Sequence, residues 1–348
     1  MLMKNAFFLL LCLSVGRLFA AERFDFVFCW GRVTDEASAR AYAEVGVTDI
    51  SASGEEAVAA AKKFGMRPYC GFGPVGPHSQ VLNADDQRHY DYINAKDLQG
   101  KVPNDECERA RNKRLTATRC QFGGEPVTSP DMCPEMIPCF LSDTNCAMSK
   151  ARIDKTLREN PLAEGISFDY IGYVNFHSCE CADCQLRVAA YLKEKRLDAT
   201  EDNRDSYFRE ALVNYINTLV EYAKSVRPGL KVTIHLYPVF RPDPLYGRDL
   251  KADYIQQTVA WYFPWPDEKI IDYTKSIVTA KHMSGAVSVP FVGLNAGTGG
   301  ALAHKSPERL ETELKLILSA GGHSLGICNG GDMLKPGYRE VFKKYAGR

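Results

Sequence analysis

The sequence predicts a closed α/β fold, the (β/α)8 TIM barrel, in which eight parallel strands alternate with helices. Two observations predict it: eight short apolar runs, and the helical patterns that separate most of them. With 348 residues, 45% hydrophobic and 25% charged, the chain has the size and composition of a globular barrel protein. An open doubly wound sheet is the alternative arrangement for the same alternation.

The expected strands follow one another from residue 23 onward. The first one, 23–31, ends at a glycine and precedes a helical stretch with a Thr cap. The other seven are expected at 47–53, 67–73, 164–173, 231–238, 254–263, 288–297 and 321–330. No GxGxxG loop follows the first strand and no GxxxxGK[ST] motif occurs, so the sequence does not support a nucleotide site.

The segment from Pro74 to about Cys146 does not fit the repeat. It contains Pro, Gly, Asn, Asp and five cysteines, with weak periodicity, and it lies where the loop after the third strand belongs. Loops of this length in a compact domain are usually functional or held together by special bonds. We therefore predict a long Cys-rich insertion, about 74–146, in the barrel.

The N-terminus has the pattern of a secretory signal peptide. A single Lys precedes an apolar run from Ala6 to Val15, and small residues follow at Ala20 and Ala21. We expect cleavage after residue 20, a single barrel domain over 21–348, and a secreted or periplasmic protein with no membrane association. The remaining chain is nearly neutral without basic patches, which argues against nucleic acid and favours an uncharged partner such as carbohydrate.

Strand periodicity indicates which side chains face the barrel interior. In 164–173 the bulky residues suit the helix layer, which leaves Ser167 and Asp169 facing inward. In 231–238 the same argument turns Thr233, His235 and Tyr237 inward. Because active sites of such barrels form at the C-terminal ends of the strands, Asp169 is the best-placed carboxylate.

Cys179, Cys181 and Cys184 form a CxCxxC array directly after the fourth expected strand. Such close neighbours do not easily form disulfides with one another, but all three can bind one metal ion. A closed zinc site needs a fourth ligand, and the insertion offers Cys146, Cys139 or Cys133. Disulfides with distant cysteines and a redox Cys-x-x-Cys pair are the alternatives.

The stretch "FDYIGYVNFHSCECADCQ", together with "NCAMSKAR" upstream, resembles the zinc-containing β-galactosidase family of glycoside hydrolases. In that family a CxCxxC cluster follows the fourth strand and a fourth Cys precedes the third helix, which implies zinc bound by Cys146, Cys179, Cys181 and Cys184. The same layout is similar to secreted glycoside-hydrolase-like barrels. One difference is that those enzymes end the fourth strand with Asn-Glu, whereas this chain has Phe168-Asp169-Tyr170.

These observations lead us to expect a glycoside hydrolase acting on a poly- or oligosaccharide, with Asp169 as a catalytic carboxylate and structural zinc as the cofactor. Glycoside hydrolysis usually needs two carboxyl groups, and Asp243 is the favoured partner ahead of Asp267 and Asp332. The alternative is a barrel that binds carbohydrate without cleaving it. The expected sugar-binding side chains, all near strand ends, are Trp30, His235, Tyr237, Trp261, Tyr262, Asn295 and Asn329.

Overall fold

The fold is a closed barrel of eight parallel strands, as the sequence predicts. The computed structural model describes residues 23–84, 137–169, 171–173, 178–236, 249–262, 266–296 and 303–346. Parallel pairing runs from β1 through β7 in order, and β9 closes the barrel between β7 and β1. The strands are β1 (Phe26–Cys29), β2 (Asp49–Ser51), β3 (Arg67–Phe72), β4 (Gly165–Phe168), β5 (Lys231–Leu236), β6 (Tyr254–Tyr262), β7 (Val287–Ala296) and β9 (Ser324–Cys328). The short β8 (Ala303–His304) pairs antiparallel with the end of β7.

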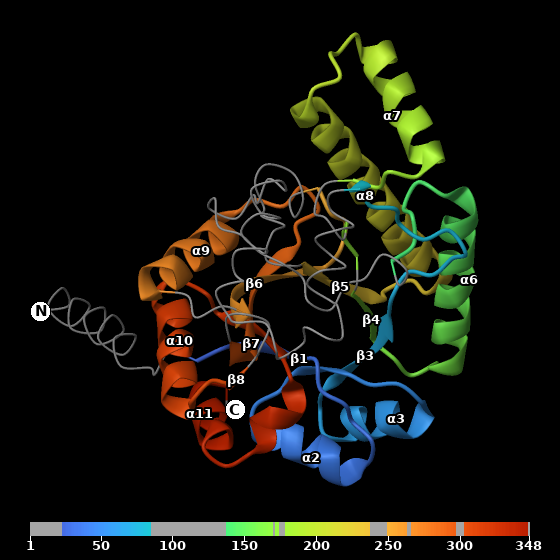
Figure 1. Cartoon of the computed structure of the whole chain (residues 1–348). Helices are drawn as coiled ribbons and strands as arrows, with labels where there is room; N and C mark the ends of the chain where they lie inside the picture. The colour runs from blue at the N-terminus through green and yellow to red at the C-terminus, as the bar shows by residue number, and fades with distance from the viewer. Residues whose placement is uncertain are drawn as a thin grey trace, which may run out of the picture.

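Helices surround this barrel on the outside (Figure 1). They are α2 (Glu36–Glu44), α3 (Glu55–Lys63), α6 (Asp143–Glu159), α7 (Ala182–Lys195), α8 (Glu201–Val226), α9 (Asp267–Thr279), α10 (Pro307–Ser319) and α11 (Tyr338–Tyr345), with a 3-10 turn η2 (Gly330–Leu334) after β9. Several begin at side-chain caps: Asp35, Ser142, Thr200 and Ser306 each accept a backbone N–H of the first turn. The sequence therefore fixes these helix starts locally.

The predicted side-chain parity of β4 and β5 is confirmed. Ile166 and Phe168 of β4 and the apolar residues of β5 belong to the core between strands and helices. On the inner side, Thr233 accepts a hydrogen bond from Gln256 of the neighbouring strand, and His235 lies among aromatic rings contributed by other strands. The barrel is thus a packed core, and its C-terminal mouth presents the ends of these inward rows.

A buried ion pair closes the N-terminal end of the barrel. The Asp49 side chain is fully buried, and its carboxylate lies 2.9 Å from Nε of Arg67, whose side chain is 36% exposed. Arg67 also lies over the rings of Phe26 and Tyr254, which stack with centroids 4.5 Å apart. An ion pair, hydrogen bonds and ring contacts therefore stabilise the N-terminal end of the barrel, opposite the mouth.

The ends of the predicted insertion meet beside β3. Ser79 and Pro138 form an antiparallel bridge, and the backbone N–H of Gln80 donates to the carbonyl of Ile137 at 2.9 Å. Cys107, Cys120 and Cys133 lie outside the described residues, as does the predicted signal peptide. In the part of the chain that the structure describes, no helix has the length and hydropathy to cross a bilayer.

Replacing Arg67 with Met should lower the free energy of unfolding by about 3 kcal/mol, because the buried Asp49 charge loses its partner. Burial raises the pKa of the Asp49 carboxyl, so the loss should shrink as the pH falls and the carboxyl becomes protonated. Urea denaturation measures this. Lys62→Met is the matched control, because it breaks an exposed pair with Glu164 and should cost no more than about 0.5 kcal/mol. Equal losses in both variants would contradict the prediction.

Candidate functional site

Asp169 and His235 meet at the C-terminal mouth of the barrel. Asp169 directly follows β4, and its backbone N–H donates to the carbonyl of Phe72 at 3.0 Å, which extends the pairing with β3. Its Oδ1 lies 3.3 Å from Nδ1 of His235 on β5. The Asp169 side chain is 26% exposed and that of His235 only 4% exposed. A solvent-accessible carboxylate therefore contacts a buried imidazole.

Neighbouring strands fix the orientation of the imidazole ring. His235 stacks on Phe291 of β7 with centroids 4.2 Å apart, and it lies near Trp30 and Trp261 at 6.0 and 5.7 Å. Its Nε2 lies 3.5 Å from the hydroxyl of Thr258. With the proton on Nδ1, His235 donates to the Asp169 carboxylate, and Nε2 accepts from Thr258. In this tautomer the hydrogen bond orients the Asp169 carboxylate.

Trp30 is held at the mouth by a polar row that crosses the barrel. Its Nε1–H donates to Oε1 of Gln256 at 2.8 Å, and Nε2 of Gln256 donates to Thr233 at 2.7 Å. The Trp30 ring remains partly exposed. On the β3 side, a Cβ added at Gly71 would meet no atom of the described residues within 4 Å.

A β-bulge turns Trp261 toward the same mouth. The register between β6 and β7 shifts around Ala260, and both Val259 and Ala260 pack in the helix-side core. Trp261 consequently points inward, against Phe291 at 5.3 Å. Its ring occupies the place of the side chain that Gly293 lacks, because a Cβ there would lie 1.8 Å from the ring.

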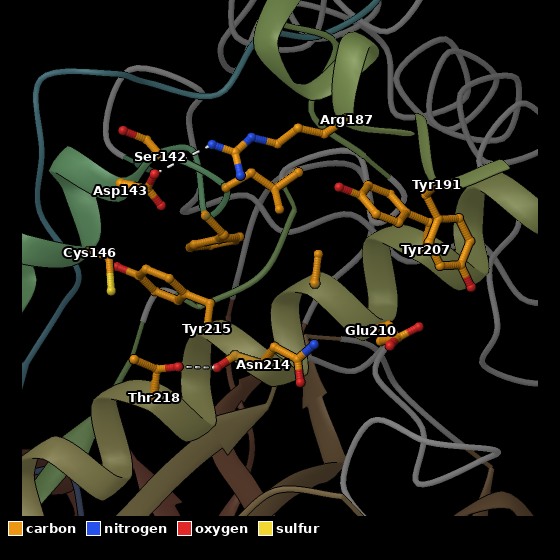
Figure 2. A pocket seen from close by; sticks show the side chains of 13 residues that line it. Ser142, Asp143, Cys146, Arg187, Tyr191, Tyr207, Glu210, Asn214, Tyr215 and Thr218 are labelled. Atoms are coloured by element: carbon orange, nitrogen blue, oxygen red, sulfur yellow. Dashed lines mark hydrogen bonds and ion pairs between the residues drawn. The ribbon is translucent and has the colours of Figure 1, made fainter. Parts of the chain in front are cut away.

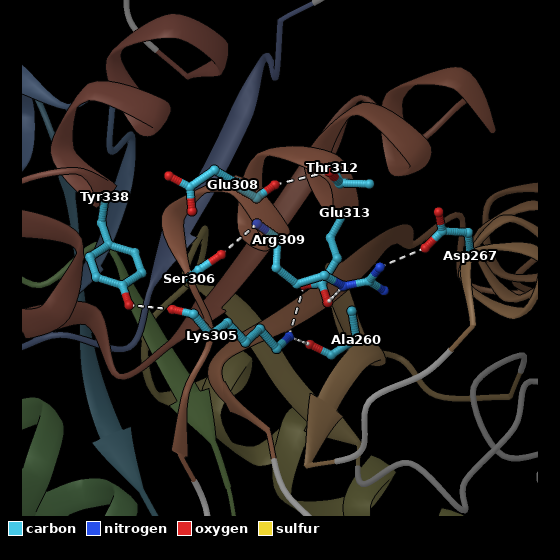
Figure 3. A network of polar contacts seen from close by, with 9 residues as sticks. All are labelled: Ala260, Asp267, Lys305, Ser306, Glu308, Arg309, Thr312, Glu313 and Tyr338. Carbon is cyan, nitrogen blue, oxygen red and sulfur yellow. Dashed lines mark hydrogen bonds and ion pairs between the residues drawn. The ribbon is translucent and has the colours of Figure 1, made fainter.

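A buried ion pair stabilises the bulged backbone (Figure 3). Nζ of Lys305 donates to the carbonyl of Ala260 at 2.6 Å and to Glu313 of α10 at 2.8 Å, and both charged side chains are 3% exposed. Burial lowers the pKa of the Lys305 ammonium group, and the Glu313 carboxylate opposes that effect. Arg309 bridges the same Glu313 to Asp267 at the start of α9. Asp267, a candidate second carboxylate, is therefore engaged in an ion pair.

The remaining candidates from the sequence have different placements. Asp243 and Tyr237 lie outside the described residues, and for Tyr262 and Asn295 the structure describes only the strand backbone. Asn329 has a left-handed backbone with φ of 61° and precedes η2. Asp332 follows in that turn, 2.6 Å from Lys335 and 3.5 Å from His304.

Four cysteines gather beside the loop that follows β4. The sulfur atoms of Cys139, Cys179, Cys181 and Cys184 all lie within 4.8 Å of one another, and only Cys181 is partly exposed. The Sγ atom of Cys139 lies 3.3 Å from that of Cys184 and 3.9 Å from that of Cys181. All four are free thiols among the described residues. A group of four sulfur ligands at these separations can bind a metal ion.

The expected ligand set is corrected at one position, since Cys139 rather than Cys146 completes the group. The backbone explains the difference: the N–H of Cys139 donates to the carbonyl of His78, and the Asn145 side chain donates to the carbonyl of Cys139 at 2.9 Å. These bonds hold Cys139 beside the CxCxxC array. Cys146 lies within α6 and lines a different pocket.

Within the four-cysteine group, the surroundings of Cys179 favour the thiolate form. Hydrogen bonds from the Cys139 and Cys184 thiols lower the pKa of Cys179 to about 2, despite burial, and backbone N–H groups add to this effect. One of them is the N–H of Val81, which lies 3.4 Å from the sulfur. The bound form of a thiol ligand is the thiolate, so this environment suits metal coordination.

The comparisons with known structures confirm the class of fold. The glycoside hydrolase domain of PgaB (BpsB) from Bordetella bronchiseptica superposes with a TM-score of 0.58 at 10% identity over 94% of this chain and 100% of that one. α-L-Fucosidase isoenzyme 2 from Paenibacillus thiaminolyticus gives 0.52 at 14% identity, over 93% of this chain and 49% of the enzyme. β-Galactosidase from Bacillus circulans sp. alkalophilus gives 0.52 at 10% identity, over 88% and 50%.

The chain therefore shares its barrel fold with these three solved structures, and it spans about half the length of the last two enzymes. No protein-family model matches the sequence, and no curated protein matches it in a sequence search. At these identities the likeness concerns the fold, so the function has to be argued from the site.

Gly293→Ala should displace Trp261, because the new methyl group would overlap its ring. We expect a loss of about 1–3 kcal/mol in the free energy of unfolding and a shift in tryptophan emission as the ring moves. Gly71→Ala is the control in a strand of the same barrel, where the methyl group meets no atom within 4 Å in the part of the chain that the structure describes. If both variants have wild-type emission and stability, the inward position of Trp261 is wrong.

Proposed function

We propose that this protein is an exported glycoside hydrolase that acts on a poly- or oligosaccharide, with Asp169 as a catalytic carboxylate. The observation that carries the proposal is the Asp169–His235 contact at the mouth of a barrel whose fold is that of glycoside hydrolases. Solvent reaches the Asp169 carboxylate, a buried imidazole contacts it at 3.3 Å, and the ring of Trp30 lies 6.0 Å from that imidazole.

Asp169 acts as the nucleophile in this proposal. In this proposal the hydrogen bond between His235 and Oδ1 orients the Asp169 carboxylate toward the anomeric carbon of the sugar. Asp243, on the segment after β5, supplies the acid that protonates the leaving oxygen and then activates water. In a retaining enzyme the two carboxyl groups stand about 5 Å apart, and in an inverting one roughly 6.5–9.5 Å apart.

Substrate binding rests on aromatic faces and hydrogen-bonding side chains around the mouth. Trp30 offers a partly exposed ring on the β1 side, whereas the ring of Trp261 is buried against His235 on the β6 side. Flat rings of this kind stack on the apolar faces of sugars. Tyr237, Tyr262, Asn295 and Asn329 are proposed as partners of sugar hydroxyl groups.

Asp169→Asn should abolish sugar release while leaving the fold intact. Loss of a catalytic carboxylate costs on the order of 10²–10⁴-fold in rate or more. The measurement is reducing-sugar and chromophore release from a panel of polysaccharides and aryl glycosides. Asp198→Asn, an exposed carboxylate after α7, is the matched control and should keep wild-type rates.

The same panel separates catalysis from binding alone. If the wild type releases no sugar from any substrate but binds glycans measurably, the protein is a non-catalytic carbohydrate-binding barrel. If Asp169→Asn retains full activity, the site is elsewhere. Asp243→Asn, tested beside Asp332→Asn, identifies the second carboxylate, because loss of the acid is least harmful with a good aryl leaving group.

We further propose that the four-cysteine group binds a structural zinc ion. Tetrahedral zinc with Zn–S bonds of about 2.3 Å separates its sulfur ligands by about 3.8 Å, close to the separations at Cys139. Cys181 caps α7 and Cys184 lies in its first turn, whereas Cys139 precedes α6. Zinc would therefore tie the loops after β3 and β4 together beside the mouth.

Cys139→Ser should reduce the bound zinc from about one equivalent to nearly none and lower the thermal stability, because three thiolates do not close the tetrahedron. Cys146→Ser is the matched control and should keep the metal. Elemental analysis of the purified protein with thiol titration measures both. Wild-type protein with no zinc and no free thiols would establish disulfides instead.

A further inference from the structure

A second pocket lies outside the barrel, between the three helices α6, α7 and α8 (Figure 2). Its volume is about 310 Å³, the lower end of the range of about 300–1,000 Å³ for small-molecule sites. It is separate from the mouth residues already described: its lining includes none of Asp169, His235, Trp30 or Trp261.

Aromatic rings form much of the pocket wall. Tyr191 of α7 and Tyr207 of α8 lie with centroids 4.9 Å apart, and both are partly exposed. Deeper in the pocket, Phe140 and Tyr215 lie 5.0 Å apart and are buried. The hydroxyl of Tyr215 is paired with Ser149 at 2.9 Å, so this floor is fixed before any ligand binds.

Polar side chains of α8 complete the pocket. Glu210 and Asn214 stand one turn apart on the same helix face and are exposed. Within the described residues, neither the Glu210 carboxylate nor the Asn214 side-chain amide has a hydrogen-bond partner in the protein. A carboxylate and an amide beside aromatic faces are the groups that bind the hydroxyl groups and the apolar face of a sugar ring.

The charges in the pocket argue against an anionic ligand. Among the described lining residues Arg187 is the only cation, and it is paired with Asp183 at 3.1 Å and with Asp143 at 3.6 Å. Glu210 then leaves the lining slightly acidic among the described residues. Phosphate or a uronic acid would meet no uncompensated positive charge here, whereas an uncharged sugar requires none.

The pocket and the C-terminal mouth of the barrel are built in part from neighbouring residues of the same segments. Phe140 follows Cys139 of the sulfur group, and Arg187 lies one turn after Cys184 on α7. Phe140 also contacts Tyr173, at 5.4 Å, in the loop that begins with Asp169. The four-cysteine group therefore borders both a wall of the pocket and the segment that carries the candidate nucleophile.

From these observations we infer that the pocket between α6, α7 and α8 is a second saccharide site, which binds neutral sugar units of a polymer outside the barrel mouth. This inference rests on the proposed glycosidase function, because it specifies a polymeric, uncharged saccharide as the substrate of the proposed enzyme. A second site that binds the same polysaccharide raises its local concentration near Asp169 through multivalent attachment.

The test is affinity gel electrophoresis in the presence of neutral polysaccharides: dextran, galactomannan, arabinoxylan and mixed-linkage β-glucan. The wild type should be retarded by at least one of them, and Glu210→Gln combined with Asn214→Ala should weaken that retardation by about tenfold in apparent Kd. Both residues are exposed, so the double variant should fold, which circular dichroism checks. Tyr207→Ala should have a similar effect.

Glu194→Gln, an exposed carboxylate of α7 outside the pocket lining, is the matched control and should be retarded like the wild type. Retardation unchanged in the pocket variants, or absent for every polysaccharide, would overturn the second site. Whether the protein hydrolyses glycans is measured separately, as sugar release by the wild type. Retardation that a pocket variant reduces in a protein without hydrolytic activity would support the pocket and reject the catalytic proposal.

Discussion

Closure of the barrel is the constraint on which the rest of the structure depends. Once β9 pairs with both β1 and β7, the inward side chains of eight strands have to fill one interior and satisfy one another there. Thr233, Gln256 and Trp30 do so as a continuous hydrogen-bonded row. His235 occupies the next layer toward the mouth, where rings contact it and its two nitrogen atoms have partners on β6 and at the end of β4.

Much of this arrangement can be read from the sequence, because it follows from local periodicity. The eight strands and the inward positions of Asp169 and His235 were predicted from the alternation of bulky and polar residues, and the structure confirms them. The predicted CxCxxC group is also confirmed as a cluster able to bind metal. Its fourth member could not be ranked from spacing, since Cys139, Cys146 and Cys133 are similarly distant along the chain.

The features that the sequence could not predict depend on contacts between distant segments. Cys139 joins the cluster because the chain around His78 returns to pair with it, a long-range backbone contact without a local signal. Lys305 sits in a stretch that reads as an ordinary helix start, yet its ammonium group is buried beside Glu313 and the carbonyl of Ala260. Glu313 occurs among the apolar positions of α10, and this buried polar position was the one available signal.

The Lys305–Glu313 pair is best explained by geometry rather than by stability. Replacing a buried ion pair with apolar side chains is often neutral or stabilising, so such a pair needs another reason to be present. Here the ammonium group binds the carbonyl that the bulge in β6 removes from regular pairing, and an apolar side chain would leave that carbonyl without its partner. The bulge in turn decides the direction of Trp261. An alternation without it would point Trp261 toward the helices and leave His235 without one of its ring contacts. The ion pair thus affects the mouth indirectly. It binds the carbonyl of Ala260, and the bulge at that point of β6 sets the direction of Trp261.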